Sequence, residues 1–515
     1  MLLKIRHALL EISNQPNSKK SAVIINNEII ITSGCILQDY VRPMQPFVTD
    51  ESNENICAST KIIRRLQQCQ LINAQNETDE AQHLNSLSYQ VTFDRRKLPN
   101  NATKSPHQAL ILTRYRAKLL YLFSSAEVSR TLHNLLSHST AADSSHNHVL
   151  LSSFLVLSMH HPSNERENLE RFFAHIESYL RYLHPIHTLD DVMTMCSPFG
   201  LENFYKTISI GKVSNVLGRD ACLFVMSNSL PLGCEGSAVF NNKLRLIGMI
   251  VCTSFQRQEE NVNLTIAVNF SHLLYDFMHQ LGIRVAPVRI TRDPSNFTWE
   301  RSLVVIESAG SQGTGTFVKV RNKTFILTCS HVVFKVTVAC RSVDGEFESE
   351  VVWRNPQYDK AFDVAVLTAP AHIPERYCVR LSAVKPFVGQ TVYNAGFPYF
   401  VNFHLKYDFN PSIFQGRIIK CTAGAIMSDG CVQAGQSGGP MFDENGCILG
   451  ICVSNIKMDR IVYPNINTAV PIHEIRTTLG SYAKTSDVAI LNNLVASKEI
   501  QRVWSMKTPI ILSKL

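Results

Sequence analysis

Apolar residues along this chain come mostly in short runs that alternate with polar positions and end at turn-forming residues. Residues 21–32, SAVIINNEIIIT, and residues 315–328, GTFVKVRNKTFILT, each place two β-branched or aromatic runs around an Asn-centred turn, a pattern typical of β-hairpins. Short strands of this kind continue to about residue 280 and again to about residue 470. Helical periodicity is convincing only in a few segments, such as residues 164–183 and 488–504. The pattern therefore predicts an all-β protein made of barrels or sandwiches.

The strand-rich parts of the chain are repeated. Residues 233–251, GCEGSAVFNNKLRLIGMIV, match residues 435–453, GQSGGPMFDENGCILGICV, at an offset of 202, and Ala267-Val268 matches Ala469-Val470 at the same offset. Upstream the match continues at other offsets, 296 for residues 23–36 against 318–333 and 210 for residues 152–158 against 362–368. An offset that holds over separate blocks indicates two copies of one domain.

The fall of the offset from 296 to 210 predicts about 86 extra residues in the first copy, between about residues 38 and 150. This insertion is polar and in places rich in Asn, Ser and Gln, so we expect part loop and part added helix, and a site for proteolytic nicking. The predicted organisation is a first domain at 1–285 that carries the insertion, a linker at 286–300, a second domain at 301–485 and a C-terminal segment at 486–515.

Composition narrows the function classes. The chain has 515 residues, 18% of them charged, with a net charge of +8 and no long Lys/Arg block, so nothing favours a nucleic-acid partner. Its 14 cysteines lack the CxxC…CxxC spacing of a zinc site, and we expect no metal and no cofactor. Charged residues interrupt the apolar start MLLKIRHALLEIS, and the longest later run, LRLIGMIVC, is too short to span a bilayer. We therefore expect a soluble intracellular chain with reduced cysteines and no membrane span.

The turn QAGQSGGPMF, residues 433–442, holds Ser437 between glycines. Alone it could be an ordinary loop, but in the same half His331 ends the strand-like FILTCSH and Asp363 begins the apolar run DVAVL. A serine hydroxyl needs a neutral imidazole to accept its proton and a carboxylate to hold that imidazole in the right tautomer. It also needs N–H groups aimed at the developing oxyanion, and we predict the amides of Gly435 and Ser437 as those donors.

These blocks resemble the trypsin-like serine proteases, and among them the HtrA/Deg branch. The similar segments are TCSHVV, FDVAVL, QAGQSGGPMF, ILGICVSN and NTAVPI, which span about 170 residues in the order His, Asp, Ser. The resemblance implies two six-stranded antiparallel β-barrels with the three residues in the cleft between them. It implies His331 as general base, Asp363 as orienting carboxylate and Ser437 as nucleophile.

Other positions modify what the resemblance implies. Gln436 stands where digestive members carry an Asp that pairs with a new N-terminus, so we expect no activation of that kind. Cys431, six residues before Ser437, falls at the base of the family's specificity pocket, which implies no acidic base and no preference for Lys or Arg; an inert buried thiol is the alternative. Ser454 and Asn455 are expected to flank the substrate strand.

The first half has lost all three catalytic positions. His331 aligns with Cys35, Asp363 with Ser153, and Ser437 with Glu235. We expect a degenerate trypsin-like domain without catalytic activity. Its role would be to pack on the active half, to bind substrate at an exosite or to regulate the enzyme. The predicted fold is therefore all-β, with tandem trypsin-like double β-barrel domains of which only the second is catalytic.

The tripeptide Ser513, Lys514 and Leu515 reads as a receptor-read address for the peroxisome. A degenerate and an intact trypsin-like domain followed by SKL resembles the peroxisomal leader-peptide-processing proteases. That resemblance implies a matrix endopeptidase that removes N-terminal presequences from imported proteins, processes enzymes of fatty-acid β-oxidation and cleaves itself. Its partners would be these preproteins and the import receptor, and a homo-oligomer is left open. The alternatives are a non-catalytic two-barrel client-binding or regulatory protein, and a secreted protease.

Overall fold

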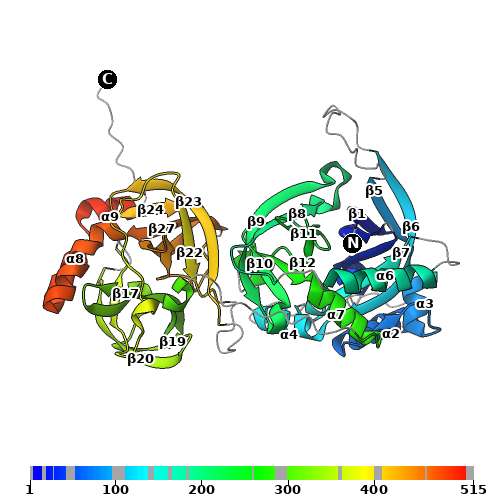
Figure 1. The fold of residues 1–515 in the computed structure, drawn as a ribbon, viewed down its shortest axis with the longest axis horizontal. Helices are drawn as coiled ribbons and strands as arrows, with labels where there is room; N and C mark the ends of the chain where they lie inside the picture. Colours follow the sequence, from blue (N-terminus) through cyan, green and yellow to red (C-terminus); the bar gives the residue numbers. More distant parts are fainter. Residues whose placement is uncertain are drawn as a thin grey trace, which may run out of the picture. The chain divides into compact units, whose positions relative to one another are not determined.

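The computed structural model describes residues 4–13, 19–26, 28–41, 53–94, 111–136, 144–159, 165–180, 185–257, 260–284, 298–357, 362–399, 409–458 and 461–505 (Figure 1). The chain divides into two compact units, Met1–Asp293 and Pro294–Leu515, and each is described by itself. Most of the predicted linker at 286–300 and the tripeptide Ser513–Leu515 lie outside the described residues, as do parts of the predicted insertion.

The second unit contains two closed six-stranded antiparallel barrels. The first barrel has the strand order β16-β17-β18-β21-β20-β19, and the second has the order β22-β23-β24-β27-β26-β25. The strands are β16 (Leu303–Ser308), β17 (Ser311–Val320), β18 (Lys323–Thr328), β19 (Thr337–Ser342), β20 (Gly345–Arg354), β21 (Ala365–Thr368), β22 (Thr391–Gly396), β23 (Ser412–Thr422), β24 (Ala425–Ser428), β25 (Pro440–Phe442), β26 (Ile448–Met458) and β27 (Ile461–Pro471). The predicted hairpin at 315–328 is formed by β17 and β18, where Phe317 pairs with Ile326.

The first unit also contains two rings of strands. Its first sheet has seven strands in the order β4-β6-β5-β1-β2-β3-β7, and an additional β6–β7 pairing closes six of them into a ring and leaves β4 outside. Its second barrel is closed in the order β10-β15-β12-β11-β8-β9, and β13 and β14 form a separate hairpin. The strands are β1 (Ile5–Ile12), β2 (Lys20–Ile25), β3 (Ile29–Ser33), β4 (Ile72–Asn73), β5 (Tyr89–Asp94), β6 (Leu112–Ser124), β7 (Ser153–Ser158), β8 (Asp191–Cys196), β9 (Thr207–Leu217), β10 (Leu223–Met226), β11 (Ala238–Asn241), β12 (Leu246–Cys252), β13 (Phe255–Arg257), β14 (Glu260–Val262) and β15 (Thr265–Asn269).

The two units share one connectivity. In the first barrel of each unit, the third strand pairs with the sixth. These strands are β3 and β7 in the first unit and β18 and β21 in the second. Buried apolar side chains from the inward faces fill each barrel, with Phe224 and Ile250 in the second barrel of the first unit and Ile426 and Met441 in that of the second. The predicted all-β fold with tandem double β-barrels is therefore confirmed.

The predicted insertion differs from the structure in one respect, because it contains barrel strands. β5 and β6 lie within residues 38–150 and are the fourth and fifth strands of the first ring. The additional helices come before and after these strands, and they are α1 (Gln38–Val41), α2 (Asn53–Gln67), α3 (Asp79–Asn85), α4 (Ala126–Leu136) and α5 (Ser144–Leu151). Repeat matching missed β5 and β6 because their sequences have diverged, although a strand needs only alternating burial to keep its place.

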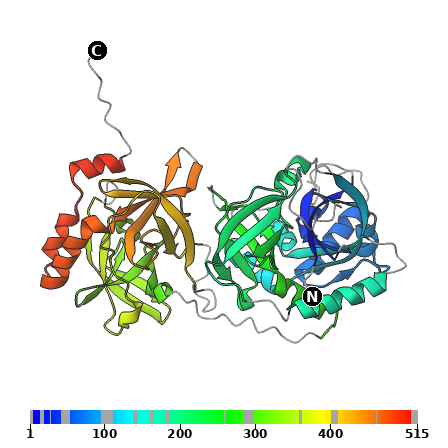
Figure 2. The same ribbon diagram turned by 45° about the horizontal axis from the view of Figure 1, so that its top comes forward.

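Helices lie against the outside of both units (Figures 1 and 2). The first unit carries α6 (Glu165–Leu180), and in each unit a helix follows the last barrel strand, α7 (Phe270–Gln280) and α8 (Ile472–Thr485). The second unit also carries α9 (Lys498–Trp504). α8 buries Ile475, Leu479 and Tyr482, and the Tyr482 ring meets Phe325 of β18 edge-on, with 6.0 Å between centroids. The apolar face of α8 therefore packs against the outside of the closed first barrel of the second unit at β18.

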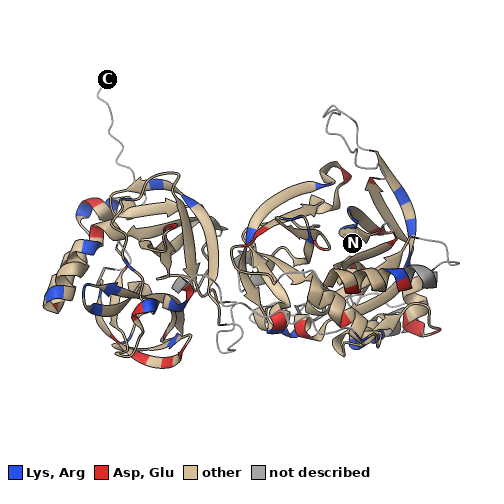
Figure 3. Cartoon of the chain, in the orientation of Figure 1, with Lys and Arg blue, Asp and Glu red and all other residues tan. Residues whose placement is uncertain are grey.

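Lys and Arg are interspersed with Asp and Glu over both units (Figure 3). The strand β6 is an exception, with alternating Arg114, Arg116 and Lys118 toward its outer face. Among the helices that the structure describes, none is both long enough and apolar enough to cross a membrane.

His7 on β1 predicts an acid sensitivity of the first unit. The ring is buried with Nε2 2.7 Å from Ser197 Oγ, and burial followed by the charge of Lys206 lowers its pKa to about 3. Between pH 6.5 and 3 the unfolded chain therefore binds a proton that the folded unit does not, so stability falls as the pH falls. At pH 5 the loss is about 2 kcal/mol.

Hydrogen exchange of first-unit peptides in the full chain, followed from about pH 7 to about pH 5, measures this loss. In His7→Gln the pH dependence should shrink, because glutamine does not titrate. The exposed His372→Gln is the control and should leave it unchanged. An equal loss in wild type and His7→Gln would contradict the assignment to His7.

Candidate active site

His331 and Asp363 meet because their strands pair. His331 lies in the short 3-10 helix η7 (Ser330–Val332) directly after β18, and Asp363 lies two residues before β21. The pairing of Thr328 with Ala365 places both strand ends side by side. The His331 Nδ1 is hydrogen-bonded to the Asp363 carboxylate, whose other oxygen accepts the His331 backbone N–H at 3.0 Å.

Burial makes this pair directional. Asp363 is 3% exposed, whereas the side chain of His331 is 33% exposed. An ionised carboxylate only accepts hydrogen bonds, so the ring proton belongs on Nδ1 and Nε2 is left as an acceptor. The arrangement is the one in which an imidazole can take a proton from a hydroxyl.

The turn with Ser437 packs against the same strand end. The Thr314 N–H of β17 donates to the Ser437 carbonyl at 2.9 Å, and the Gly438 N–H donates to the Cys452 carbonyl at 2.8 Å. Gly438 has φ +84°, and a Cβ there would lie 2.2 Å from Thr328 Oγ1, so only glycine fits. Because Thr328 is three residues before His331, this contact brings the serine turn to the imidazole.

Ser437 itself is not bonded to His331. Its Oγ donates to the Val453 carbonyl of β26 at 3.0 Å. Hydrogen bonds between nucleophile and base are often absent without substrate and form in the complex, and a change of the Ser437 χ1 rotamer would redirect the hydroxyl. Of the three predicted residues, the structure therefore shows Asp363 and His331 in contact, with the Ser437 turn packed at the end of β18 and no Ser–His hydrogen bond.

The backbone of the turn offers free donors. Gly435 has φ +96°, and a Cβ there would lie 2.6 Å from the Phe397 carbonyl oxygen. Its own carbonyl accepts from Thr314 Oγ1 at 2.9 Å. Among the described residues we find no acceptor for the N–H of Gly435 or of Ser437, so both predicted oxyanion donors remain available to a ligand.

Gln436 fixes the turn from inside and is 1% exposed. Its Oε1 accepts from the Gln433 N–H at 2.7 Å, and its Nε2 donates to the Ser412 carbonyl at 3.3 Å. A neutral amide thus holds the turn through partners within the chain.

The predicted specificity residues lie around the segment just before this turn. Cys431 is buried, burial raises the pKa of its thiol to about 12, and Gln433 Nε2 lies 3.1 Å from its Sγ, so it supplies no charge. Asn455 Nδ2 donates to the Val432 carbonyl at 2.8 Å, and Ser454 beside it is exposed on β26. Both flanking residues therefore come from the strand that also supplies the Val453 carbonyl.

A buried polar network beside Cys431 was missed by sequence reasoning. Asn394 Nδ2 donates to Ser428 Oγ at 3.2 Å and to the Gly430 carbonyl at 2.9 Å. Ser428 in turn donates to Asn467 Oδ1 at 2.9 Å, and Asn467 Nδ2 donates to the same Gly430 carbonyl. The only sequence signal was polar residues inside otherwise apolar strands.

The first unit keeps the scaffold of this turn. Ser21 Oγ donates to the Gly233 carbonyl at 3.3 Å and accepts from the Ser197 N–H at 3.3 Å. Thr314 makes the same two bonds in the second unit, to the Gly435 carbonyl and from the Phe397 N–H. Gly233 and Gly236 also have positive φ, as Gly435 and Gly438 do.

What has changed in the first unit is the chemistry. Glu235, at the serine position, is 6% exposed and folds back on the turn. Its carboxylate accepts from the Gly233 N–H at 3.1 Å, from Lys20 Nζ at 2.9 Å and from Thr253 Oγ1 at 3.0 Å. An anionic oxygen thus sits on the amide equivalent to that of Gly435, which shows that this turn geometry can bind one.

The positions equivalent to His331 and Asp363 carry neither a base nor a carboxylate in the first unit. Cys35 is buried, and burial followed by the charge of Glu235 raises the pKa of its thiol to about 11, so it is not a thiolate. Ser153 Oγ donates to the Val149 carbonyl at 2.6 Å. The predicted loss of all three functional groups agrees with these contacts.

Removing the Glu235 carboxylate should destabilise the first unit. Glu235→Ala leaves the Lys20 ammonium, 16% exposed, without its salt bridge, and we expect a loss of about 3 kcal/mol. Hydrogen exchange of β2 and β11 peptides in the full chain measures it, with second-unit peptides as the internal reference. The control Asp191→Ala breaks the exposed pair with Lys212 and should cost less than about 1 kcal/mol. Equal effects of the two changes would contradict the structural role of Glu235.

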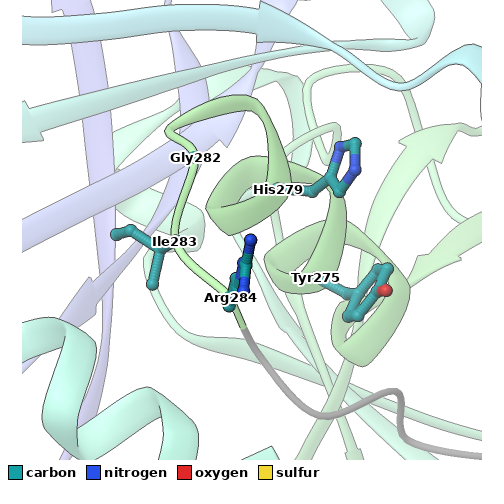
Figure 4. A pocket seen from close by; sticks show the side chains of 5 residues that line it. All are labelled: Tyr275, His279, Gly282, Ile283 and Arg284. Atoms are coloured by element: carbon teal, nitrogen blue, oxygen red, sulfur yellow. The ribbon is translucent and has the colours of Figure 1, made fainter.

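Two pockets lie away from these residues. One is at the end of α7 in the first unit and is lined by Tyr275, His279, Gly282, Ile283 and Arg284 (Figure 4). The other is in the second unit, where Trp299, Arg376, Arg380 and Cys447 are among its lining residues. Neither contains His331, Asp363 or Ser437.

Comparison with known proteins bears on the second unit. Residues 313–451, which include His331, Asp363 and Ser437, match the trypsin-like peptidase domain family. Among curated proteins no match is found.

Similar solved structures include three proteases. The serine endoprotease from Yersinia pestis is 19% identical, with a TM-score of 0.31, and 37% of this chain covers 65% of that one. Rv3671c from M. tuberculosis H37Rv, in an inactive form, is 24% identical, with a TM-score of 0.30, and 38% of this chain covers 96% of it. The HtrA-type protease AlgW with a tripeptide is 18% identical, with a TM-score of 0.30, and 36% of this chain covers 62% of that one.

This chain thus spans slightly less than two thirds of the Yersinia pestis and AlgW proteins. The family match, in contrast, covers the strands from β18 to β25 and all three residues of the candidate site. The second unit therefore contains a trypsin-like peptidase domain.

Proposed function

We propose that the second unit is a serine endopeptidase in which Ser437 is the nucleophile, His331 the general base and Asp363 the orienting carboxylate. The observation that carries the proposal is the contact of the buried Asp363 with His331 Nδ1, together with a serine turn in which the amides of Gly435 and Ser437 have no acceptor among the described residues. A structural serine turn alone would not need an oriented imidazole next to it.

The chemistry follows from the geometry. Ser437 Oγ turns from the Val453 carbonyl toward His331 Nε2, gives up its proton and attacks the scissile carbonyl. The Gly435 and Ser437 amides stabilise the oxyanion, and Asp363 stabilises the imidazolium. His331 then returns the proton to the leaving amine, and water repeats the sequence to release the acyl group and regenerate the hydroxyl.

A fluorophosphonate probe tests the proposal, since it labels only an activated serine. We expect wild type to be labelled at Ser437 and Ser437→Ala to be unlabelled. Ser481→Ala, an exposed serine of α8, is the matched control and should label like wild type. A folded wild type that resists the probe would support a non-catalytic two-barrel client-binding or regulatory protein, an alternative favoured by the present bond of Ser437 Oγ to Val453.

The finer proposal is that this peptidase acts in the peroxisome matrix on imported preproteins, where it removes N-terminal presequences and processes enzymes of fatty-acid β-oxidation. It is supported by the tripeptide Ser513, Lys514 and Leu515, an address that an import receptor reads at a free carboxyl end, and by the pairing of a degenerate with an intact barrel unit. Self-cleavage in the polar part of the first unit belongs to the same proposal.

Two measurements test location and substrate. Deleting Ser513–Leu515 should move a tagged chain from peroxisomes to the cytosol. Mass spectrometry of new N-termini in peroxisomes should show presequences retained with Ser437→Ala and removed with wild type. Equal retention in both would overturn the processing role and leave the peptidase proposal intact.

A further inference from the structure

A third group with metal-binding chemistry adjoins the Asp–His pair. Cys329, two residues before His331, is 0% exposed, and its thiol donates to the Cys452 carbonyl at 3.3 Å. One ligand atom each from Cys329, His331 and Asp363 lie within 4.8 Å of one another. Over the described parts of the chain, no other three His, Cys, Asp or Glu side chains gather in this way.

We propose that Cys329, His331 and Asp363 form an inhibitory zinc site, an inference that rests on the proposed peptidase function for its regulatory meaning. A thiolate, an imidazole and a carboxylate are the three ligand types that Zn²⁺ takes in proteins. The mixture of soft sulfur with nitrogen and oxygen disfavours Mg²⁺ and Ca²⁺, which take oxygen ligands. The site therefore selects zinc over the common hard cations.

The distances suit such an ion after a small movement. Tetrahedral zinc with bonds of about 2.0–2.3 Å places its ligand atoms about 3.3–3.8 Å apart, so a spread of 4.8 Å must contract by about 1 Å. The ion enters beside the partly exposed His331 ring. Three protein ligands leave the fourth position to water, as in zinc sites that remain open.

Binding exchanges protons for the metal. The Cys329 thiol loses its proton to solvent, and the hydrogen bond between His331 and Asp363 opens so that a ring nitrogen and a carboxylate oxygen can coordinate. A ring nitrogen bound to zinc holds the imidazole away from its catalytic orientation. Ser437 then lacks a base, and removal of the ion by a chelator restores it.

Metal binding is measured separately from activity. Co²⁺ added to the metal-free full chain should give a thiolate-to-metal charge-transfer band, and Zn²⁺ should abolish it by displacement. The band should disappear in Cys329→Ser, which removes the only sulfur ligand of the site, and persist in Cys340→Ser, a buried thiol of β19 that serves as the matched control. If the serine variant does not fold, Cys329→Ala replaces it.

Inhibition is then read from probe labelling of Ser437, each variant scaled to its own metal-free value. Zn²⁺ should suppress labelling of wild type and of Cys340→Ser, reversibly with EDTA. Cys329→Ser should need at least about tenfold more Zn²⁺ for the same suppression. Loss of a residue that only holds a metal ligand in place lowers metal affinity by about tenfold or more, and loss of the ligand itself should lower it at least as much. The same zinc response in Cys329→Ser and wild type, or an unchanged cobalt band, would overturn the zinc site.

The two proposals fail separately. If the probe does not label metal-free wild type, the peptidase proposal is wrong, and the cobalt band still tests the zinc site. If the probe labels Ser437 and Zn²⁺ does not suppress the labelling, only the zinc-site proposal is wrong.

Discussion

Ser437→Ala should lower kcat for cleavage of an unfolded protein substrate by about 10⁶-fold. The alanine removes the one oxygen that attacks the scissile carbonyl. The hydroxyls of Ser330 and Thr328 near His331 do not replace it, since they are committed to the Val364 carbonyl at 2.6 Å and the Thr314 carbonyl at 2.8 Å. The residual rate would come from the two backbone amides of the turn, which the substitution leaves in place, and from substrate binding. Substrate affinity should change little, because the hydroxyl acts in the transition state.

The measurement is steady-state cleavage of a quenched fluorescent casein, with peptide mapping to exclude contaminating proteases. Ser481→Ala on α8 should match wild type. The variant should also stay folded, since it loses one partly buried hydrogen bond, to Val453, worth about 1 kcal/mol. A folded Ser437→Ala that keeps a tenth of the wild-type rate would exclude Ser437 as the nucleophile.

Asp363→Asn should lower kcat by about 10⁴-fold with little change in fold. The carboxylate now accepts from both the ring Nδ1 and the backbone N–H of His331. An amide in its place can present an N–H to the ring, which then carries its proton on Nε2 and cannot accept the serine proton. The loss is smaller than for Ser437→Ala because the nucleophile and the oxyanion donors remain.

Raising the pH should distinguish a tautomer defect from a misfolded site. Hydroxide can partly replace the base, so the rate of Asp363→Asn should rise with pH over a range in which the wild-type rate is flat. Asp344→Asn, an exposed residue of the β19–β20 turn, is the matched control and should behave as wild type. A variant with the wild-type rate and pH profile would remove Asp363 from the mechanism.

The sequence was sufficient for the parts of the protein that follow from local pattern. The hairpin at 315–328 and the 202-residue offset predicted the barrel repeat, and the positions of His331 and Asp363 at strand ends predicted the contact that they make. These features are readable because each depends on a few side chains near a strand end.

Other features of the fold and of the candidate site depend on pairings between segments that are far apart in the sequence, and these could not be predicted from the sequence. β5 and β6 keep their place in the first ring through backbone pairing, which leaves no motif. The Glu235 carboxylate finds Lys20 and Thr253 from opposite parts of the first unit. Cysteine spacing did not single out Cys329, because a rule for paired cysteines does not consider one thiol close to a histidine and an aspartate from another strand end.

The carboxylate that occupies the first unit's turn makes a serine at that position costly for the stability of the unit. Glu235→Ser alone would leave the Lys20 ammonium, 16% exposed, without its salt bridge, while Cys35 and Ser153 still stand where the second unit has His331 and Asp363. A serine at this position would therefore lower the stability of the first unit without gaining a base, so engineering a nucleophile there would first require a new partner for Lys20.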